Sequence, residues 1–420
     1  MNAHASSRPD IAIAGAGPAG TIAAILLTRA GARVTLVQGA HGARRMEGAG
    51  QRLIAALKAQ RLPLAGLGPL VTRRVVWGDL SASENTEHSL SRPTFDAALV
   101  AQAKDEGVLV CSASVTRVAP GVIDTTKGRI HAGLVFEARG RRAPVAAERV
   151  RGTPSVSISA PVSDAIDQAE VRALPEGWLW RIGTWAQVTV DAENARDPES
   201  VWRRMTGVEP TGPLVVRASE LRLSVPTLDP ALPRLGDAAV AMDPLSGHGL
   251  FWALGSALMA APLADALLHG RTALAERFYT DRVTATFFKQ ARVGRDFYRA
   301  AGLATPFWAR RSAWPDDLPY ETPPPPSPVL DRRVVVRGGR LAETDVLVTP
   351  QEPEGAAFAF GIELGPVLAQ LRRTPVPDRA SFAAHILPGM PPEQAARLYD
   401  WLAERGMTAA SAPKHKEVLT

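Results

Sequence analysis

The chain has 420 residues, of which 46% are hydrophobic and 21% are charged, so it is long enough for two or three domains around a large globular core. Its 48 basic and 42 acidic residues give a net charge of only +6, and this mixed balance argues against nucleic acid as a partner. The single cysteine, Cys111, excludes an internal disulfide and a thiolate metal site, and we predict no metal. The first ten residues lack the basic and apolar regions of a secretion signal, so we expect a cytoplasmic protein without membrane contact.

A strand–turn–helix unit is the first element predicted along the chain. The apolar run Ile11 to Ala14 is typical of a buried parallel strand, and residues 21–30 have a helical pattern that ends at Gly31. The turn between them has the spacing G-x-G-x-x-G, whose missing Cβ atoms let backbone N–H groups approach a pyrophosphate at the positive end of the helix. The residues that we expect to contact the nucleotide are Gly15, Gly17, Ala19 and Gly20. The alternative is an ordinary strand-to-helix turn.

The second predicted strand, at residues 33–38, ends at Gln38. A dinucleotide site usually has Asp or Glu at this position, where the carboxylate accepts hydrogen bonds from the adenosine ribose. The Gln38 side chain keeps an acceptor oxygen but has no charge. We therefore include Gln38 among the cofactor-binding residues, as a departure from the usual pattern.

A second glycine-bearing stretch lies more than 200 residues downstream. It contains Gly-Asp at 236–237 and a proline and two glycines just before a long apolar helical pattern. Together with the first turn, this stretch resembles the FAD-binding fold of aromatic-ring monooxygenases and flavin-dependent halogenases. The resemblance implies that Asp237 binds the flavin ribityl chain and that Pro244, Gly247 and Gly249 lie against the isoalloxazine. Helix N–H groups near Gly249 then point at the flavin O2 atom, where reduced flavin accumulates negative charge.

Three further side chains become candidates through this resemblance. Glu47 belongs to a loop that passes close to the flavin in the family, Arg92 begins a helix whose arginine approaches the cofactor, and His248 lies between two glycines beside the flavin. We assign Arg92 to cofactor binding, and His248 and Glu47 to catalysis as groups that protonate or hold the peroxide. Each has an ordinary alternative as an exposed side chain of a loop or a helix start.

Residues 151–225 change to short alternating segments, which predict a mixed or antiparallel sheet over the flavin. Within it, the sequence Trp-Leu-Trp-Arg-Ile resembles the Trp-x-Trp-x-Ile-Pro motif of halogenases, and alternation places Trp178 and Trp180 on one strand face. Both are candidate walls of an aromatic substrate pocket, with simple core packing as the alternative. The strand predicted at 71–80 contributes Arg73 to this pocket but has no lysine. Because tryptophan halogenases have an essential lysine in the corresponding strand, its absence argues against that type of halogenation.

The expected organisation is an α/β fold in which a Rossmann-like FAD-binding domain is combined with a mixed substrate-binding sheet. A Pro-rich linker leads to a small α+β winged-helix-like domain with two strands and three helices, interpreted as a module that docks a protein or peptide, or as a lid over the active site. The predicted boundaries are a first FAD-binding segment at 1–150 with a substrate-side insertion around 45–90, the substrate sheet at 151–225, a second FAD-binding segment with its helices at 226–315, the linker at 316–331 and the small domain at 332–420.

The resemblance implies an FAD-dependent monooxygenase that hydroxylates an electron-rich aromatic ring through a flavin C4a-hydroperoxide, with O2 as co-substrate and NAD(P)H or a flavin reductase as electron source. A halogenase-like core without the lysine, followed by an extra small domain, is similar to the enzymes that oxidise a peptidyl tryptophan during tryptophylquinone biogenesis, as for quinohaemoprotein amine dehydrogenase. The aromatic substrate is then part of a polypeptide. The alternatives are a flavin-dependent halogenase or hydroxylase of a small aromatic natural product, and a non-catalytic regulatory flavoprotein whose small domain binds a partner.

Overall fold

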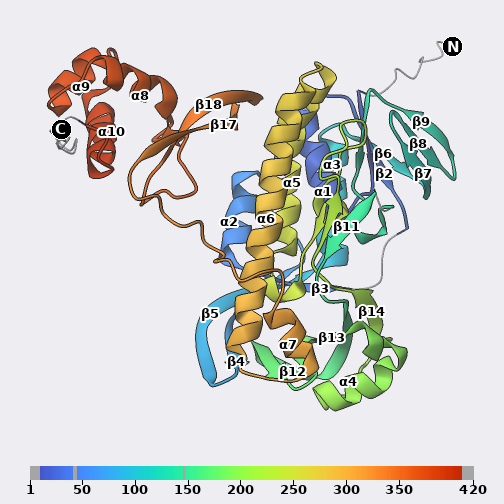
Figure 1. Cartoon of the computed structure of the whole chain (residues 1–420). Helices are drawn as coiled ribbons and strands as arrows, with labels where there is room; N and C mark the ends of the chain where they lie inside the picture. The colour runs from blue at the N-terminus through green and yellow to red at the C-terminus, as the bar shows by residue number, and fades with distance from the viewer. Residues whose placement is uncertain (1–9, 41–44, 145–146, 409–420) are drawn as a thin grey trace, which may run out of the picture. The chain divides into compact units, whose positions relative to one another are not determined.

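The computed structural model describes residues 10–40, 45–144 and 147–408 (Figure 1). The chain forms two compact units that divide between Tyr320 and Glu321. The predicted linker begins in the first unit, where Asp316 accepts hydrogen bonds from Arg292, and its end lies in the first strand of the second unit.

A four-stranded parallel sheet begins the first unit, in the order β10-β1-β2-β6. Strands β1, β2 and β10 are short, largely apolar and almost fully buried, whereas the edge strand β6 is partly exposed. The first helix starts at Pro18, three residues earlier than the pattern predicts, since proline suits the first turn of a helix. The elements of this sheet and its helices are β1 (Ile11–Ala14), α1 (Pro18–Arg29), β2 (Val34–Gln38), α3 (Arg92–Asp105), β6 (Leu109–Ser112) and β10 (Leu134–Glu137).

A six-stranded mixed sheet, in the order β13-β12-β4-β5-β3 with β14 beside β12, lies at the lower end of this unit in Figure 1. It joins the predicted insertion around 45–90 to the predicted substrate sheet. In place of short separate segments, β12 and β13 form one long antiparallel hairpin with register shifts between Pro161 and Glu170. The elements are β3 (Met46–Ala49), α2 (Gln51–Ala59), β4 (Leu67–Trp77), β5 (Leu80–Ser91), β12 (Ser155–Leu174), β13 (Gly177–Asp191) and β14 (Val215–Ala218).

Two long helices complete the first unit. Helix α5 is apolar on nearly all sides because it packs against α1 in the core. By length and composition it could cross a membrane, but about two thirds of it is buried inside this unit. Helix α6 is a single helix of 29 residues. The elements are η3 (Gly236–Ala238), β16 (Val240–Ala241), η4 (Pro244–Ser246), α5 (Gly249–Leu268), α6 (Thr272–Ala300) and α7 (Pro306–Ser312).

Smaller elements connect these sheets and helices. A three-stranded meander follows β6, and in a second small sheet β15 lies between β11 and β16 and pairs with both. Helix α4 covers the β12–β13 hairpin, where the buried ring of Trp202 packs against Val188 and its neighbours. The elements are β7 (Val115–Ala119), β8 (Val122–Thr125), β9 (Gly128–His131), η1 (Gly140–Arg142), β11 (Glu148–Arg151), η2 (Ala192–Arg196), α4 (Pro198–Thr206) and β15 (Arg222–Val225).

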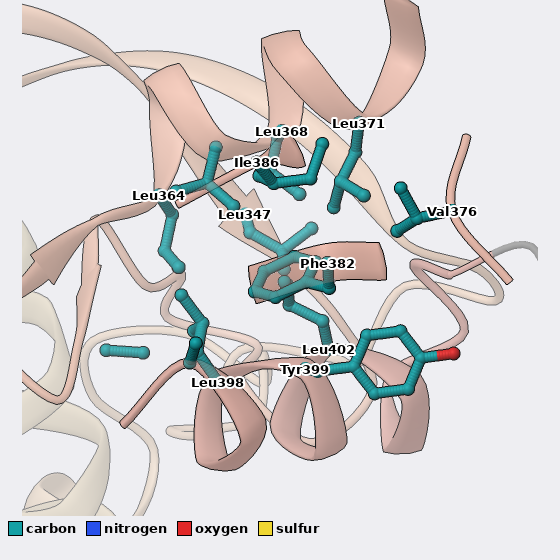
Figure 2. Close-up of a cluster of buried hydrophobic side chains, with 13 residues drawn as sticks. Leu347, Leu364, Leu368, Leu371, Val376, Phe382, Ile386, Leu398, Tyr399 and Leu402 are labelled. Carbon is teal, nitrogen blue, oxygen red and sulfur yellow. The ribbon is translucent and has the colours of Figure 1, made fainter. Parts of the chain in front are cut away.

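The second unit consists of a β-hairpin, a very short strand pair and three helices. Gly338 and Gly339 both have positive φ and form the two-residue turn of the hairpin. Figure 2 shows the core of the unit, with the ring of Phe382 among leucines of the helices and of β18. The two strands and three helices appear where the sequence predicts them, whereas the winged-helix-like arrangement stays a prediction. The elements are β17 (Val329–Arg337), β18 (Arg340–Val348), β19 (Phe358–Ala359), β20 (Ile362–Glu363), α8 (Leu364–Arg373), α9 (Arg379–His385) and α10 (Pro392–Glu404).

Candidate active site

One large cavity, of about 1990 Å³, lies in the first unit. Its lining joins the turn after β1, the turns around η3 and η4, and one face of the mixed sheet. Small-molecule pockets typically measure roughly 300–1000 Å³, so this cavity has room for a dinucleotide and a second molecule. All the predicted site residues except Gly20 line it: Gly15, Gly17, Ala19, Gln38, Glu47, Arg73, Arg92, Trp178, Trp180, Asp237, Pro244, Gly247, His248 and Gly249.

The three glycines of the first turn have different roles. Gly15 has φ +113°, and a Cβ there would lie 2.6 Å from the carbonyl oxygen of Ala138. Only glycine therefore allows the backbone at residue 15 to approach the backbone at residue 138 so closely. A Cβ at Gly20 would clash with the carbonyl oxygen of Gly15, which places Gly20 under the turn rather than at the cavity. A Cβ at Gly17 would meet nothing within 4 Å. Gly17 is therefore the glycine that leaves open space for a ligand.

Three helices begin at the cavity without a side-chain cap. The N-cap residues are Gly17 for α1, Gly50 for α2 and His248 for α5, and none of their side chains accepts a backbone hydrogen bond. The first N–H groups of each helix have no partner within the helix, and the helix dipole makes this end positive. Ten arginine and lysine side chains and five carboxylates line the described part of the cavity. These features fit an anionic dinucleotide such as FAD.

The Gly-Asp turn meets the first turn directly. Gly236 has φ +57°, and a Cβ there would lie 2.6 Å from the Cβ of Ala19. Helix α5 holds this turn in place: the N–H of Gly236 donates to Oγ of Ser256 (2.9 Å), and its carbonyl accepts from Nε1 of Trp252 (3.2 Å). Asp237 is thereby fixed at the cavity beside the start of α1.

Glu47 and Arg92 form one charged group. Arg92 is buried, donates through Nη1 to Oε1 of Glu47 (2.5 Å) and holds Asp96 through Nε and Nη2 (both 3.0 Å). Arg45 also pairs with Glu47 (2.7 Å). Burial raises the pKa of the Glu47 carboxyl above its ordinary value, although Arg45 opposes this shift. Arg92 therefore orients Glu47 at the cavity edge, an ion-pair role that the sequence did not indicate.

His248 lies at the start of α5, and its ring faces the ring of Phe251 edge-on, with centroids 6.4 Å apart. Its Nδ1 is buried, without a hydrogen-bond partner among the described residues. Burial lowers the pKa of His248 below its ordinary value, so the imidazole is neutral at neutral pH and its two ring nitrogens can donate or accept a proton.

The mixed sheet forms an aromatic wall of the cavity. Trp178 and Trp180 of β13 both line the cavity, as alternation predicts. Behind them, Trp308 packs edge-on against Trp77, with centroids 5.1 Å apart, and against Tyr298 at 5.7 Å. This support gives the wall a fixed shape.

Sequence reasoning missed two carboxylates that line the cavity, the buried Glu87 and the half-buried Asp243. Glu87 of β5 accepts a hydrogen bond from Nε1 of Trp180 (3.3 Å). Asp243 accepts from the N–H of Leu245 (2.9 Å) and from the hydroxyl of Tyr298 (3.0 Å), and burial raises its pKa. Asp243 immediately precedes the proline of the second stretch, which was a usable signal. Glu87 had none, because the strand around it is polar throughout.

A comparison with solved structures gives a match over nearly the whole chain. QhpG, a peptidyl tryptophan dihydroxylase essential for tryptophylquinone cofactor biogenesis, is 32% identical with a TM-score of 0.77, and the match covers 95% of this chain and 100% of QhpG. The chain belongs to the FAD-dependent monooxygenase family that includes QhpG. The predicted resemblance is confirmed, and the enzyme is an FAD-dependent monooxygenase whose cavity has the features that FAD requires.

Other matches show the same fold at lower identity. The flavin-dependent halogenase CmlS is 17% identical with a TM-score of 0.67, covering 96% of both chains. PqsL, a probable FAD-dependent monooxygenase from Pseudomonas aeruginosa, is 18% identical with a TM-score of 0.54, covering 70% of this chain and 99% of PqsL. No protein-family model and no curated protein sequence matches the chain. The α/β fold of this family, with its parallel sheet and its mixed sheet, is therefore confirmed.

Proposed function

We propose that this monooxygenase hydroxylates the indole ring of a tryptophan residue within a polypeptide, during biogenesis of a tryptophylquinone cofactor. The observation that carries the proposal is the 32% identity to the peptidyl tryptophan dihydroxylase QhpG, which extends over 95% of this chain and so includes the second unit. O2 is the co-substrate, and NAD(P)H or a separate flavin reductase supplies the electrons.

When bound, FAD would pass electrons from the donor to O2 and so supply the oxidising chemistry for ring hydroxylation. The residues of the chain bind and orient it. Backbone N–H groups at the start of α1 bind the pyrophosphate, Gln38 and Asp237 bind the ribose and the ribityl chain, and Arg92 acts through Glu47 at the cavity edge. Pro244, Gly247 and Gly249 line the part of the cavity where the isoalloxazine would lie, and the first N–H groups of α5 would stabilise negative charge there.

The side chains around the remaining space position the ring. Trp178 and Trp180 provide flat apolar surface for an indole, and Arg73 bounds the same pocket. An indole is nucleophilic without losing a proton, so positioning and exclusion of water supply most of what the reaction needs. The neutral imidazole of His248 and the carboxyl of Glu47, whose pKa is raised, are the groups that hold or move protons next to the cofactor.

The second unit is proposed as the module that docks the polypeptide substrate, with a winged-helix-like arrangement of its hairpin and helices. QhpG acts on a peptidyl substrate, and the match to it covers the whole of QhpG and nearly all of this chain. A lid over the active site is the alternative for this unit. A cavity larger than a dinucleotide needs is consistent with a substrate that enters as a side chain of a larger molecule.

The experiment is a hydroxylation assay with labelled oxygen. The holoenzyme is incubated with NADH, a flavin reductase, 18O2 and tryptophan-containing peptides, each paired with a control peptide that has phenylalanine in place of tryptophan. We expect mass spectrometry to find 18O on the tryptophan ring and none in the controls. Oxygen uptake without labelled product would contradict the proposal. Ring chlorination in the presence of chloride would replace it with halogenation, the reaction of CmlS, which shares the fold.

A further inference from the structure

We propose that the Glu87 carboxylate binds the ring N–H of the substrate at the aromatic wall of the cavity. This inference rests on the proposed hydroxylation of an indole and adds a substrate-binding group that the sequence did not indicate. It follows from where Glu87 lies, from what its two oxygens contact and from the chemistry of the surfaces beside it.

Glu87 lies on the sheet face that lines the cavity, and its residue is only 6% exposed. It is opposite Val71 of β4 and two positions from Asn85, which is opposite Arg73. The neighbouring strand β3 has a glycine at the point where the carboxylate lies: a Cβ at Gly48 would clash with Oε2 of Glu87. The missing side chain of Gly48 therefore leaves the space in which the Glu87 carboxylate lies beside the cavity.

The two oxygens of Glu87 have different surroundings. Oε1 accepts the indole N–H of Trp180 at 3.3 Å. Oε2 is directed over the backbone of Gly48, which also lines the cavity. The carboxylate thus already binds one indole N–H in the structure, and its second oxygen is placed to accept another from a ring inside the cavity. An indole N–H is only a donor, so it requires an acceptor at this depth.

Two neighbouring groups interact favourably with the charged form of the Glu87 carboxyl. Burial raises the pKa of Glu87, and the guanidinium of Arg73 and the N–H of Trp180 oppose this shift. The Nε of Arg73 is buried and has no hydrogen-bond partner in the described part of the structure. A bound ring that donates to the carboxylate adds a third interaction with the charged form. The same hydrogen bond increases electron density on the ring, which makes the ring a better nucleophile.

The test compares two ligands of nearly the same shape. Indole has a ring N–H, whereas benzofuran has a ring oxygen that cannot donate. Binding of each to the oxidised FAD-bound full-length enzyme is followed by the change in flavin absorbance. A hydrogen bond to a charged acceptor is typically worth enough for at least a tenfold preference, so we expect wild type to bind indole about tenfold more tightly.

The variants isolate Glu87. In Glu87→Ala the cavity gains the same space for both ligands, so the ratio of their dissociation constants still reports the hydrogen bond alone. We expect this ratio to fall to about one. Glu87→Gln keeps an acceptor oxygen but removes the charge, so we expect it to retain about a threefold preference for indole. Because it preserves the volume of the side chain, it also replaces Glu87→Ala in the test if the alanine variant does not bind FAD. The control Glu170→Gln changes a carboxylate of β12 that does not line the described cavity and pairs with Arg172, and it should keep the wild-type ratio.

Wild type that binds indole no better than benzofuran, or a Glu87→Gln variant with the full wild-type preference, would overturn the inference. The result is separable from the proposed function. An enzyme that prefers indole through Glu87 but never labels a tryptophan peptide would contradict the peptidyl substrate and leave this subsite in place. A labelled tryptophan peptide, together with the same preference for indole in wild type and in the Glu87 variants, would support the peptidyl substrate and contradict this subsite.

Discussion

At the scale of single residues, Arg92 shows how the chain holds two carboxylates close together in a buried place. Its guanidinium binds Glu47 and Asp96 at once, with three N–H···O contacts of 2.5 to 3.0 Å. The fork geometry of arginine suits this arrangement, and lysine could not make the same contacts. Without the guanidinium, the two carboxylates would repel each other and Glu47 would lose its orientation toward the cofactor side of the cavity.

Replacing Arg92 with methionine tests this role. We expect Arg92→Met to lower the free energy of unfolding by about 3 kcal/mol, because it removes a buried guanidinium that pairs with two carboxylates at once and leaves Glu47 with only its contact to Arg45. The matched control is Arg29→Met, which removes a bidentate ion pair with Glu106 in which the arginine is more exposed. This substitution should lower the free energy of unfolding by about 1 kcal/mol or less. Urea denaturation of FAD-free protein measures both. Equal losses in the two variants would show that Arg92 is an ordinary surface pair.

At the scale of elements, three helices point their uncapped N-termini into one cavity, and a glycine at the first of them leaves space for the cofactor. Gly17 and Gly20 are three residues apart but face different surroundings. The space beside Gly17 is open, while that beside Gly20 is filled by the backbone of the turn. The same substitution at these two positions should therefore have opposite consequences for cofactor binding and for folding.

Gly17→Ala should leave FAD-free protein within about 1 kcal/mol of wild-type stability, the usual effect at a helix N-cap. It should weaken FAD binding at least about tenfold, because a Cβ lies where the pyrophosphate must approach. Gly20→Ala should cost about 3 kcal/mol or more in stability through overpacking. Flavin fluorescence titration and thermal unfolding separate the two effects. Unchanged FAD affinity in Gly17→Ala would contradict the proposed cradle.

The elements also show what the sequence can predict. The first strand, turn and helix were predictable because short-range patterns and glycine spacing determine them locally. The same holds for the alternation of Trp178 and Trp180 and for the hairpin and helices of the second unit. Strand β5 was missed because Asn85, Thr86 and Glu87 line a cavity with many polar groups, so this stretch lacks the apolar alternation of an ordinary strand. Glu87 was missed with it, since burial of a carboxylate depends on distant partners.

At the scale of the whole molecule, the cavity is built from segments that are far apart in the chain. The turn after β1, the insertion at residues 46–91, the β12–β13 hairpin and the start of α5 all contribute to its lining. The sequence predicted that the two glycine-bearing turns meet, and the contact between Gly236 and Ala19 agrees with this. The joining of the insertion with the β12–β13 hairpin in one sheet was not predictable, because strand pairing over such separations leaves no local pattern.

Because the chain forms two units, we expect FAD to stabilise one of them more than the other. The cavity that we assign to FAD is lined by residues of the first unit, so we expect FAD to stabilise that unit and to leave the second unit unchanged. At a free concentration of about 100 times the dissociation constant, the gain is about 2.7 kcal/mol. The first unit has the larger unfolding enthalpy because it contains more residues, which identifies its transition in calorimetry.

The most direct test of the central claim is therefore a titration of FAD-free, full-length protein with FAD, followed by calorimetry. The account predicts saturation at one FAD per chain and a rise of several degrees in the midpoint of the larger transition, with the smaller transition unmoved. Protein that stays colourless at saturating FAD, or a shift confined to the smaller transition, would contradict it.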